Sequence, residues 1–457
     1  MGKISTNQFD QKQKFRELAI AMLEKIKDEY NKSGKDWENL GDEKDKKSEK
    51  YRLEKLSNME LSNATDENLV EYLESLENAF LYTISKLPWK DRDGNCHYPV
   101  GENKVTDKFL DKVADAINDG NADQLNGENF ATVLLPNESI ENSNIKYAIP
   151  QCIKGDITNA KLYHCLLNPG SGISDTKDNY DNFYDYLHDK DAMKDHLRIF
   201  DENGYATKEK LVEYMNDLKR NMLITEFEDF IAKYGNCTIS ENKVDEIFGD
   251  NGEKEFYYIM KYYKTLVAKG IGDFRKILKK NLSNLGTLSS NLNDVKLCNL
   301  ELIPVRSQDG ATVGNLIDEN PFAVNVILRR IYIAELKNEL EKPIFVFRSY
   351  YSTQNKNDVR WQDAFKRKTD NYDGLYEYLI NNYFLTHSGT QGGAYSKNNI
   401  VTISQEGRKG PKFKVEDYKD SGKTKGLENK IELASRAYKY IDDAQNTFAS
   451  GLKRKNN

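Results

Sequence analysis

The stretch "KLYHCLLNPGSGIS", residues 161–174, ends an apolar run in Asn168, Pro169, Gly170 and Ser171. The amide of Asn168 donates and accepts hydrogen bonds but is not a strong base, so it suits positioning a water or a polar substrate. Pro169 and Gly170 favour a tight turn, because proline presets one dihedral and glycine accepts positive φ. Open α/β sheets bind ligands where a strand ends. We therefore expect Asn168 to be a functional residue. The alternative is that it belongs to an ordinary surface turn.

Two later stretches carry a second set of candidate residues. "FRSYYSTQNKNDVRW" contains Arg348, Tyr350 and Lys356, and "THSGTQGGAYSKNN" contains His387, Ser396 and Asn398. Aromatic side chains interleaved with cations suit base stacking and phosphate contact. The backbone amides of a loop rich in Gly and Ser can cradle phosphates. The alternative is that the aromatic residues pack in the core, the charged side chains are solvated, and the hydrogen bonds of His387 are made within the protein.

The basic segment "GRKGPKFK", residues 407–414, is a third candidate for a binding site, because its cations can bind phosphates. A charged surface loop is the commoner explanation of such a segment. The motifs of other chemistries are absent from the sequence: GxGxxG, the phosphate-binding P-loop, GxSxG and HExxH. The five cysteines are scattered without a CxxC pair, so we expect neither a disulfide framework nor a zinc site. We expect no metal and no organic cofactor.

The composition is that of a folded, heavily charged protein. Of the 457 residues, 31% are charged and 11% aromatic, and a disordered chain would lack the aromatics. The net charge of −6 gives no whole-protein attraction to nucleic acid, although a local basic cleft is sufficient for binding. No window approaches the roughly 20 apolar residues of a membrane span, and the N-terminus has no apolar signal core. We expect a cytoplasmic protein that does not bind membranes.

Four apolar runs predict the strands that must position these residues: 161–167, 296–305, 342–349 and 382–388. The first three have strand length, whereas the fourth can also continue the helical pattern before it. Near-continuous apolar strands separated by helices favour a sheet covered on both faces. The stretch 321–341 predicts an amphipathic crossover helix. Together these patterns predict an α/β fold with three layers and a mostly parallel sheet of about four strands.

Helical patterns surround this core. The expected organisation is a helical N-terminal region (1–130), a first part of the α/β core (131–200), a helical insertion (201–290), a second part of the core (291–402), and a basic loop with a C-terminal helix (403–457). The N-terminal helices include one through Phe15 and one capped by Thr65. The N-terminal region and the insertion are the parts that can bind a protein partner.

The strand followed by Asn-Pro-Gly resembles the first active-site motif in the mismatch-specific branch of the uracil-DNA glycosylase superfamily. The preceding "IPQCIKGDITNAK" is similar to the lead-in of uncharacterised bacterial proteins with that fold. The later runs fit the same template in order, and the loop at 386–400 resembles the one that approaches the DNA minor groove. The resemblance covers roughly residues 145–175 and 295–400.

The resemblance implies recognition of a nucleobase in DNA, flipped out of its stack, with hydrolysis of the N-glycosidic bond. Asn168 matches the residue that positions the attacking water, and His387 falls near the histidine that stabilises the departing base. The chain departs from the family pattern in two places. The local sequence is Thr386-His387-Ser388 rather than His-Pro-Ser. No aspartate occupies the water-activating position of the uracil-specific branch.

Two other functions stay open. One is a non-catalytic module of the same fold that binds nucleic acid or a nucleotide. The other is a helical interaction protein of a phage or of phage defence, with the core as a scaffold. The DNA partner, including modified or foreign DNA, is the expectation of the leading interpretation.

Overall fold

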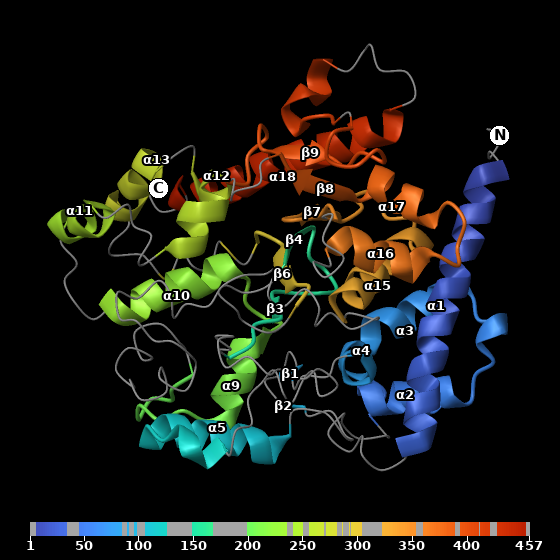
Figure 1. Cartoon of the computed structure of the whole chain (residues 1–457), viewed down its shortest axis with the longest axis horizontal. Coiled ribbons are helices and arrows are strands. Elements are labelled where there is room, and N and C mark those ends of the chain that lie inside the picture. Colours follow the sequence, from blue (N-terminus) through green and yellow to red (C-terminus); the bar gives the residue numbers. More distant parts are fainter. Residues whose placement is uncertain are drawn as a thin grey trace.

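A mixed β-sheet runs through the centre of the chain, with helices on both of its faces (Figure 1). The computed structural model describes residues 6–33, 45–84, 89–90, 96–97, 106–125, 149–167, 199–234, 241–249, 256–268, 271–280, 286, 292, 294–303, 322–352, 360–388, 394–410, 412–420 and 427–453.

The centre of the sheet contains the four strands that the apolar runs predicted. In order across the sheet they are β6 (Leu297–Glu301), β4 (Leu162–Leu166), β7 (Ile344–Phe347) and β8 (Phe384–His387). Each is parallel to its neighbour, and every residue in them is buried. Strands buried on both faces require near-continuous apolar sequence, which is the signal that predicted them. The prediction that the first three runs form strands of one sheet is confirmed, and the fourth run, which allowed a helix or a strand, also supplies a strand.

The predicted sheet of about four mostly parallel strands is wrong. Among the described residues the sheet has nine strands, in the order β2-β1-β5-β3-β6-β4-β7-β8-β9. The flanking strands are β1 (Trp89–Lys90), β2 (Cys96–His97), β3 (Ile153–Lys154), β5 (Asn216–Asp217) and β9 (Ile400–Thr402). β3 and β9 run antiparallel to β6 and β8, so the sheet is mixed. These strands have only two or three residues, too few to show a hydrophobic period in the sequence.

The order of the parallel strands reverses between β4 and β7. From β4 the chain goes to β6 on one side, and from β6 it returns past β4 to β7 and then to β8. The connections after β6 pack on one face of the sheet, and helices between β4 and β6 pack on the other. Right-handed crossovers require this change of face when the direction reverses. In such doubly wound sheets, ligands bind at the carboxyl ends of the strands beside the reversal.

One face of the sheet is covered by the N-terminal helices and by the connections from β6 to β8. They share a hydrophobic core with strand residues such as Tyr163, Cys298 and Phe345. The helices on this side are α1 (Thr6–Ser33), α2 (Glu49–Ser57), α3 (Asp66–Ser75), α4 (Glu77–Ile84), α15 (Phe322–Leu336), α16 (Trp361–Thr369) and α17 (Leu375–Asn382). The short helix η2 (Leu61–Asn63) joins α2 to α3. The predicted helices through Phe15 and within 321–341 are confirmed as α1 and α15.

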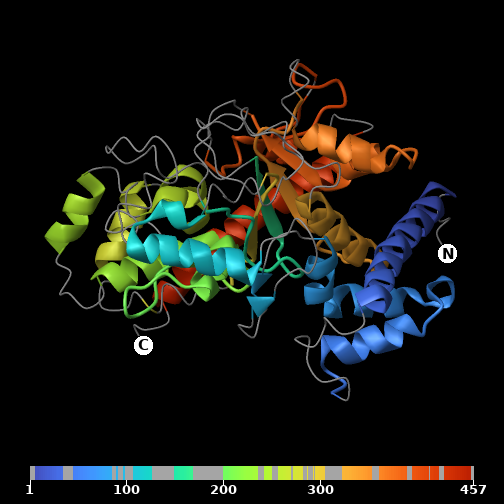
Figure 2. The ribbon, with the colours of Figure 1, turned by 60° about the horizontal axis from the view of Figure 1, so that its bottom comes forward.

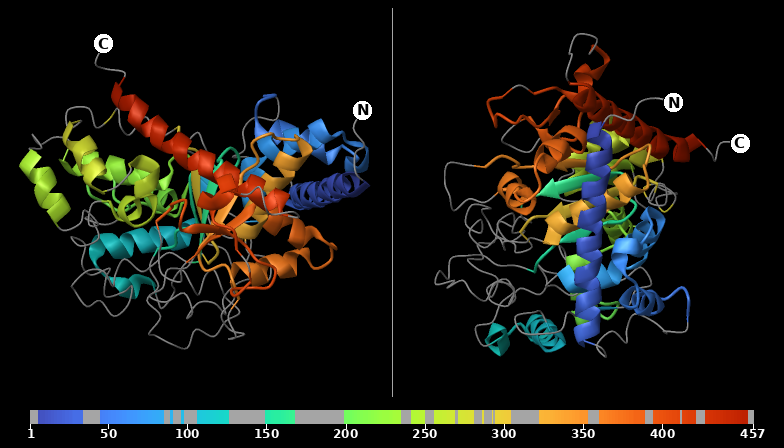
Figure 3. Two further views of the ribbon diagram at one scale, coloured as in Figure 1. Left: turned by 90° about the horizontal axis from the view of Figure 1, so that it is seen from above. Right: turned by 90° about the vertical axis from the view of Figure 1, so that its right-hand side faces the viewer.

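The opposite face is covered by the segment predicted as an insertion and by the C-terminal helix. They share a second core with Leu162, Val346 and Leu385. Its helices are α10 (Met222–Tyr234), α11 (Glu241–Gly249), the π-helical turn η4 (Ile259–Tyr263), α12 (Lys264–Val267), α13 (Ile271–Lys280) and α18 (Glu428–Lys453). α18 packs along α12 (Figure 3). Figure 2 shows the two groups of helices on either side of the sheet, so this segment supplies an outer layer of the fold.

The short-strand edge of the sheet carries its own small group of helices. α5 (Asp107–Asp119) packs against η3 (Ala122–Leu125) and α9 (Lys208–Met215), and α9 contacts β1 and β5. At the other end of the chain, η7 (Val415–Asp420) packs against α18. Among the described helices, none has the length and apolarity needed to cross a membrane.

The stretch from 66 to 84 follows one helical pattern but forms two helices, α3 and α4. The chain breaks at Leu76, and the carboxylate of Glu49 accepts hydrogen bonds from the backbone N–H groups of Asn78 and Ala79 at 3.0 and 2.9 Å. Burial raises the pKa of the Glu49 carboxyl to about 7. A cap supplied from α2 has no signature in the sequence of the helix that it starts. The predicted cap of α3 by Thr65 is confirmed, with Asn68 as its partner.

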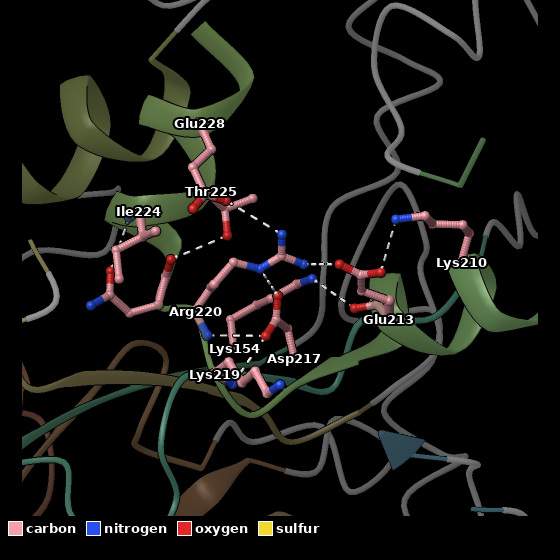
Figure 4. A network of polar contacts seen from close by, with 10 residues as sticks. Lys154, Lys210, Glu213, Asp217, Lys219, Arg220, Ile224, Thr225 and Glu228 are labelled. Atoms are coloured by element: carbon pink, nitrogen blue, oxygen red, sulfur yellow. Dashed lines mark hydrogen bonds and ion pairs between the residues drawn. The ribbon is translucent and has the colours of Figure 1, made fainter. Parts of the chain in front are cut away.

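An ion-pair network fastens β5 to the helices beside it (Figure 4). The guanidinium of Arg220 donates to Asp217 at 2.6 Å, to Glu228 at 3.3 Å and to Glu213. Lys154 donates to the backbone carbonyl of Glu213 at 3.3 Å. Burial alone would lower the pKa of Arg220, but the carboxylates of Asp217 and Glu213 raise it above its usual value. The charge of Arg220 is balanced by the carboxylates around it, so the role of the network is structural.

Candidate functional site

Polar side chains from all four parallel strands lie on one face of the sheet. Alternate strand residues such as Leu162, Leu297 and Leu385 pack in the core beneath α10, α12, α13 and α18. Because successive side chains of a strand point to opposite faces, the polar residues at the same parity share that face. They are His164 of β4, Asn299 and Glu301 of β6, Arg348 directly after β7, and His387 of β8. Together with three tyrosines described next, they form what we call the polar cluster.

The π-helical turn η4 supplies two of these tyrosines, and the segment after β8 supplies the third. Tyr262 and Tyr263 are consecutive residues of η4, and both are buried, as is Tyr395. The His164 ring centroid lies 5.2 Å from that of Tyr262, 5.5 Å from Tyr263 and 5.0 Å from Tyr395, each with a T-shaped orientation. The ring of His387 lies 5.3 Å from Tyr395. π-Helical turns are rare and occur frequently at functional sites.

A hydrogen-bonded chain joins β6 to β4 through η4. Asn299 Nδ2 donates to the Tyr263 hydroxyl at 2.5 Å, and this hydroxyl lies 2.6 Å from His164 Nδ1. Burial raises the pKa of Tyr263 well above normal, so the hydroxyl keeps its proton. Burial also lowers the pKa of His164 well below normal, so the imidazole is neutral. A neutral imidazole has one N–H donor and one acceptor nitrogen, so Nδ1 shares one hydrogen bond with the Tyr263 hydroxyl and Nε2 is left to a ligand.

Arg348 brings a positive charge to the polar cluster. Its guanidinium donates to the Tyr262 hydroxyl and lies 5.4 Å from the centroid of the Tyr262 ring. The backbone N–H of Arg348 donates to Cys165 at 2.9 Å, which extends the β7–β4 pairing by one residue. Ser349 then has a φ of 58°, a left-handed conformation that is uncommon for serine and turns the chain away from the strand. Arg348 is thus held at the carboxyl edge, beside the reversal of strand order.

His387 is the second buried imidazole of the cluster. It is 8% exposed, and its ring centroid lies 5.8 Å from that of His164. Burial, with a smaller contribution from the Arg348 charge, lowers the pKa of His387 to about 4. The ring is neutral at physiological pH, so it offers one donor and one acceptor and no charge.

The η4 turn is held in place by contacts from both of its sides. The buried carboxyl of Glu226 in α10 accepts hydrogen bonds from the backbone N–H groups of Tyr258 and Ile259, at 2.5 and 2.8 Å. The Tyr395 N–H donates to the backbone carbonyl of Tyr262 at 2.6 Å. The two tyrosine side chains are therefore positioned by backbone contacts on either side of them.

Several buried polar atoms of the polar cluster have no hydrogen-bond partner. Within the part of the chain that the structure describes, these atoms are His164 Nε2, Asn299 Oδ1, the Tyr395 hydroxyl and both ring nitrogens of His387. A buried polar atom without a partner costs about 1–3 kcal/mol. Their concentration in one place, among aromatic rings, is what a site for a planar ligand with donors and acceptors requires.

The Asn-Pro-Gly turn lies outside the described residues. This applies to Asn168, Pro169, Gly170 and Ser171, and also to Lys356. Backbone hydrogen bonds hold the residues that lead to the turn. The carbonyls of Leu166 and Leu167 accept from the N–H groups of Leu302 and Ile303 at 3.0 and 2.9 Å. The β4–β6 pairing thus continues to the residue before Asn168, at the carboxyl edge of the sheet.

The other predicted site residues divide between the polar cluster and elsewhere. Arg348 and His387 belong to the cluster. Tyr350 does not, because its buried ring packs 5.2 Å from Phe347 in the core on the opposite face. The backbone carbonyl of Ser396 accepts from Asn399 and Ile400, closing the turn that follows Tyr395, and Asn398 is exposed in that turn.

His164, Asn299 and Tyr263 were not singled out from the sequence. Two of them carried a usable signal, because a histidine or asparagine inside a strand that is otherwise apolar must find a partner or serve a site. Asn299 and Glu301 are two residues apart in the second run, which places both on the same face. Tyr263 gave no such signal, since an aromatic residue at helical spacing is usually a core residue.

A separate pocket of about 250 Å³ opens at the amino ends of the strands, with Gly155, Lys219, Asn221 and Lys296 among its lining. Its lysines are exposed, and none of its lining side chains has a buried polar atom without a partner. Nor do the described residues contain a group of three or more His, Cys, Asp or Glu arranged to hold a metal. Comparisons of the chain with protein-family models, with curated proteins and with solved structures found no match.

Proposed function

We propose that this protein recognises a nucleobase of DNA in the polar cluster and hydrolyses its N-glycosidic bond. The observation that carries the proposal is the set of buried polar atoms without partners, which lie among aromatic rings beside the reversal of strand order. His164 Nε2, Asn299 Oδ1 and the ring nitrogens of His387 offer both donors and acceptors. A heterocyclic base satisfies such groups through its edge while its faces pack on aromatic side chains.

The proposed reaction uses the same groups. Water attacks the anomeric carbon of the sugar, the C–N bond to the base breaks with both electrons going to the base, and the proton lost by the water passes to solvent. Arg348 and a neutral imidazole N–H stabilise the negative charge on the leaving base. The base must leave the stack to enter the cluster, as in other enzymes that act on bases. The family resemblance gives Asn168 the role of orienting the water, and this remains a prediction.

One observation favours binding without turnover. Burial lowers the pKa of His164 and of His387, so neither imidazole is charged near neutral pH. Neither is then suited to protonate the leaving base as a general acid. A module that only binds a base or nucleotide is therefore the second candidate.

Base release from a panel of labelled oligonucleotides tests the proposal. Each oligonucleotide, single- or double-stranded, carries one natural, deaminated or alkylated base, and hot alkali converts the abasic product into a strand break. We expect cleavage of one class of base, with the rate reduced roughly 100-fold or more by Arg348→Gln. The control is Arg367→Gln, which removes an exposed arginine from the end of α16 and leaves the rate unchanged.

The outcomes separate the two candidates. Base-dependent binding that Arg348→Gln weakens, without cleavage of any oligonucleotide, establishes the non-catalytic module. If the protein neither binds nor cleaves any oligonucleotide of the panel, both candidates are contradicted.

A further inference from the structure

An ordered basic loop follows β9, made of residues 404–410 and 412–414. Its cations are Arg408, Lys409, Lys412 and Lys414. In the described part of the chain none of these four forms an ion pair with a carboxylate, although the whole protein has a net charge of −6. Burial, with a contribution from the nearby Arg408 charge, lowers the pKa of Lys412. Like charges gathered without counter-charges create a local positive potential that attracts anionic partners.

The loop has a defined backbone. Thr402 N–H donates to the carbonyl of Phe413 at 2.8 Å, and Phe413 N–H returns a bond to the Thr402 hydroxyl at 2.9 Å. Gly407 has a φ of 85°, in the left-handed region that favours glycine. A Cβ on Gly410 would lie 2.1 Å from Ser404 Oγ, so only glycine fits there without a shift. The four cations are thus held on a closed, hydrogen-bonded loop.

Tyr351 fastens this loop to the chain that leaves β7. The Tyr351 hydroxyl accepts a hydrogen bond from the Ser404 N–H at 2.9 Å, and its backbone carbonyl accepts one from Arg408 at 3.3 Å. Lys412 Nζ lies 5.0 Å from the centroid of the Tyr351 ring. Tyr351 is three residues after Arg348, so at most about 11 Å of extended chain separates the anchor of the loop from the polar cluster.

We infer that the loop binds the phosphates of the DNA strand whose base enters the polar cluster. The inference rests on the proposed function, which fixes the partner as DNA. A nucleotide bound in the cluster has phosphates of its own strand within a few nucleotides of the site, and the loop is a positive group fastened to Tyr351, three residues after Arg348. Phosphates bound by lysine and arginine release counterions, so this contact is weakened by salt.

The test is the salt dependence of DNA binding by the variant Arg408→Gln/Lys409→Gln/Lys412→Gln. Its affinity for a fluorescent 20-nucleotide single strand is measured by anisotropy between 50 and 200 mM salt. Removing three phosphate contacts from a single-stranded complex reduces the slope of log K against log salt by roughly 2, so the wild type loses roughly 15-fold more affinity over this range than the variant. The matched control, Lys46→Gln/Lys47→Gln/Lys50→Gln, removes the same charge before and within α2 and keeps the wild-type slope.

A loop variant with the wild-type affinity and slope overturns the inference. So does unchanged DNA binding with loss of binding only to vesicles of phosphatidylserine and phosphatidylcholine, which would assign the loop to a lipid surface. The base-release assay decides the proposed function separately. Loss of base release in Arg348→Gln with no effect of the loop variant refutes only the loop, whereas a loop effect with no dependence on the base or on Arg348 refutes only the polar cluster.

Discussion

The Tyr263 hydroxyl is the single group that connects two strands of the candidate site. It receives a hydrogen bond from Asn299 and lies within hydrogen-bonding distance of His164, and all three side chains are buried. The hydroxyl thereby holds both side chains in place. A ligand that enters the polar cluster then meets a fixed pattern of donors and acceptors.

Removing this hydroxyl gives a direct prediction. Tyr263→Phe leaves Asn299 Nδ2 and His164 Nδ1 without their common partner, and we expect the free energy of unfolding to fall by about 2 kcal/mol. Tyr440→Phe is the matched control, because the Tyr440 hydroxyl is buried and has no hydrogen-bond partner among the described residues. Urea unfolding of both variants measures the difference. Equal effects of the two substitutions would mean that the Tyr263 bridge does not stabilise the cluster.

At the same scale, the sequence predicted Arg348 and His387 as site residues, and the structure places both in the polar cluster. It also predicted Tyr350, whose ring is in the opposite core, because the left-handed turn at Ser349 was not visible in the sequence. The apolar pattern shows that a residue follows a strand. The face of the sheet that its side chain reaches depends on the backbone conformation of the turn.

Among the elements, the η4 turn depends on Glu226. This carboxyl is buried in α10 and caps the chain just before Tyr262 and Tyr263. Burial raises the pKa of Glu226 from 4.5 to about 8. Between these two values the folded state holds a proton that the unfolded state has lost. Stability from this group is therefore complete below about pH 4.5 and falls as the pH rises to 8.

We predict that Glu226→Gln removes this loss. Glutamine cannot ionise but keeps only one of the two acceptor oxygens that the Tyr258 and Ile259 N–H groups use. We therefore expect the variant to be less stable than the wild type near pH 5, but to lose no stability from this group between pH 5 and 8.5, where the wild type loses on the order of 4 kcal/mol. Thermal unfolding from pH 5 to 9 measures the difference. Glu228→Gln, two residues further along α10, serves as the control and should follow the wild-type pH profile. A variant whose stability falls between pH 5 and 8.5 as much as that of the wild type would contradict the prediction.

The predictable elements were those with a long apolar period. The four parallel strands, α1 and α15 were evident because burial on one or two faces imposes a pattern on many residues. The fourth run, which allowed a helix or a strand, resolves into α17 up to Asn382 and β8 from Phe384. The two-residue strands β3 and β5 and the η4 turn have no such pattern. They depend on contacts with distant segments, such as those of Asp217 and Glu226.

For the whole molecule, the order of the strands determines where a site can form. The reversal between β4 and β7 brings the ends of both strands together, and the segment predicted as an insertion closes this face with η4. The carboxyl edge is predictable from four strands alone. The η4 turn that covers this edge is not predictable, because nothing in a helical pattern near residue 260 shows which face of the sheet the segment covers.

The central claim is that the buried imidazoles of His164 and His387 meet a nucleobase. The chain has only five histidines, so ¹⁵N-labelling of histidine gives a simple spectrum, assigned with His164→Gln and His387→Gln. We predict that both rings stay neutral at pH 5.5, since burial lowers both pKa values, that of His387 to about 4. On addition of the oligonucleotide that binds best, the signals of these two rings should move, while those of the other histidines serve as internal references. DNA binding that leaves both signals in place, or protonation of both rings near pH 6.5, would contradict the account.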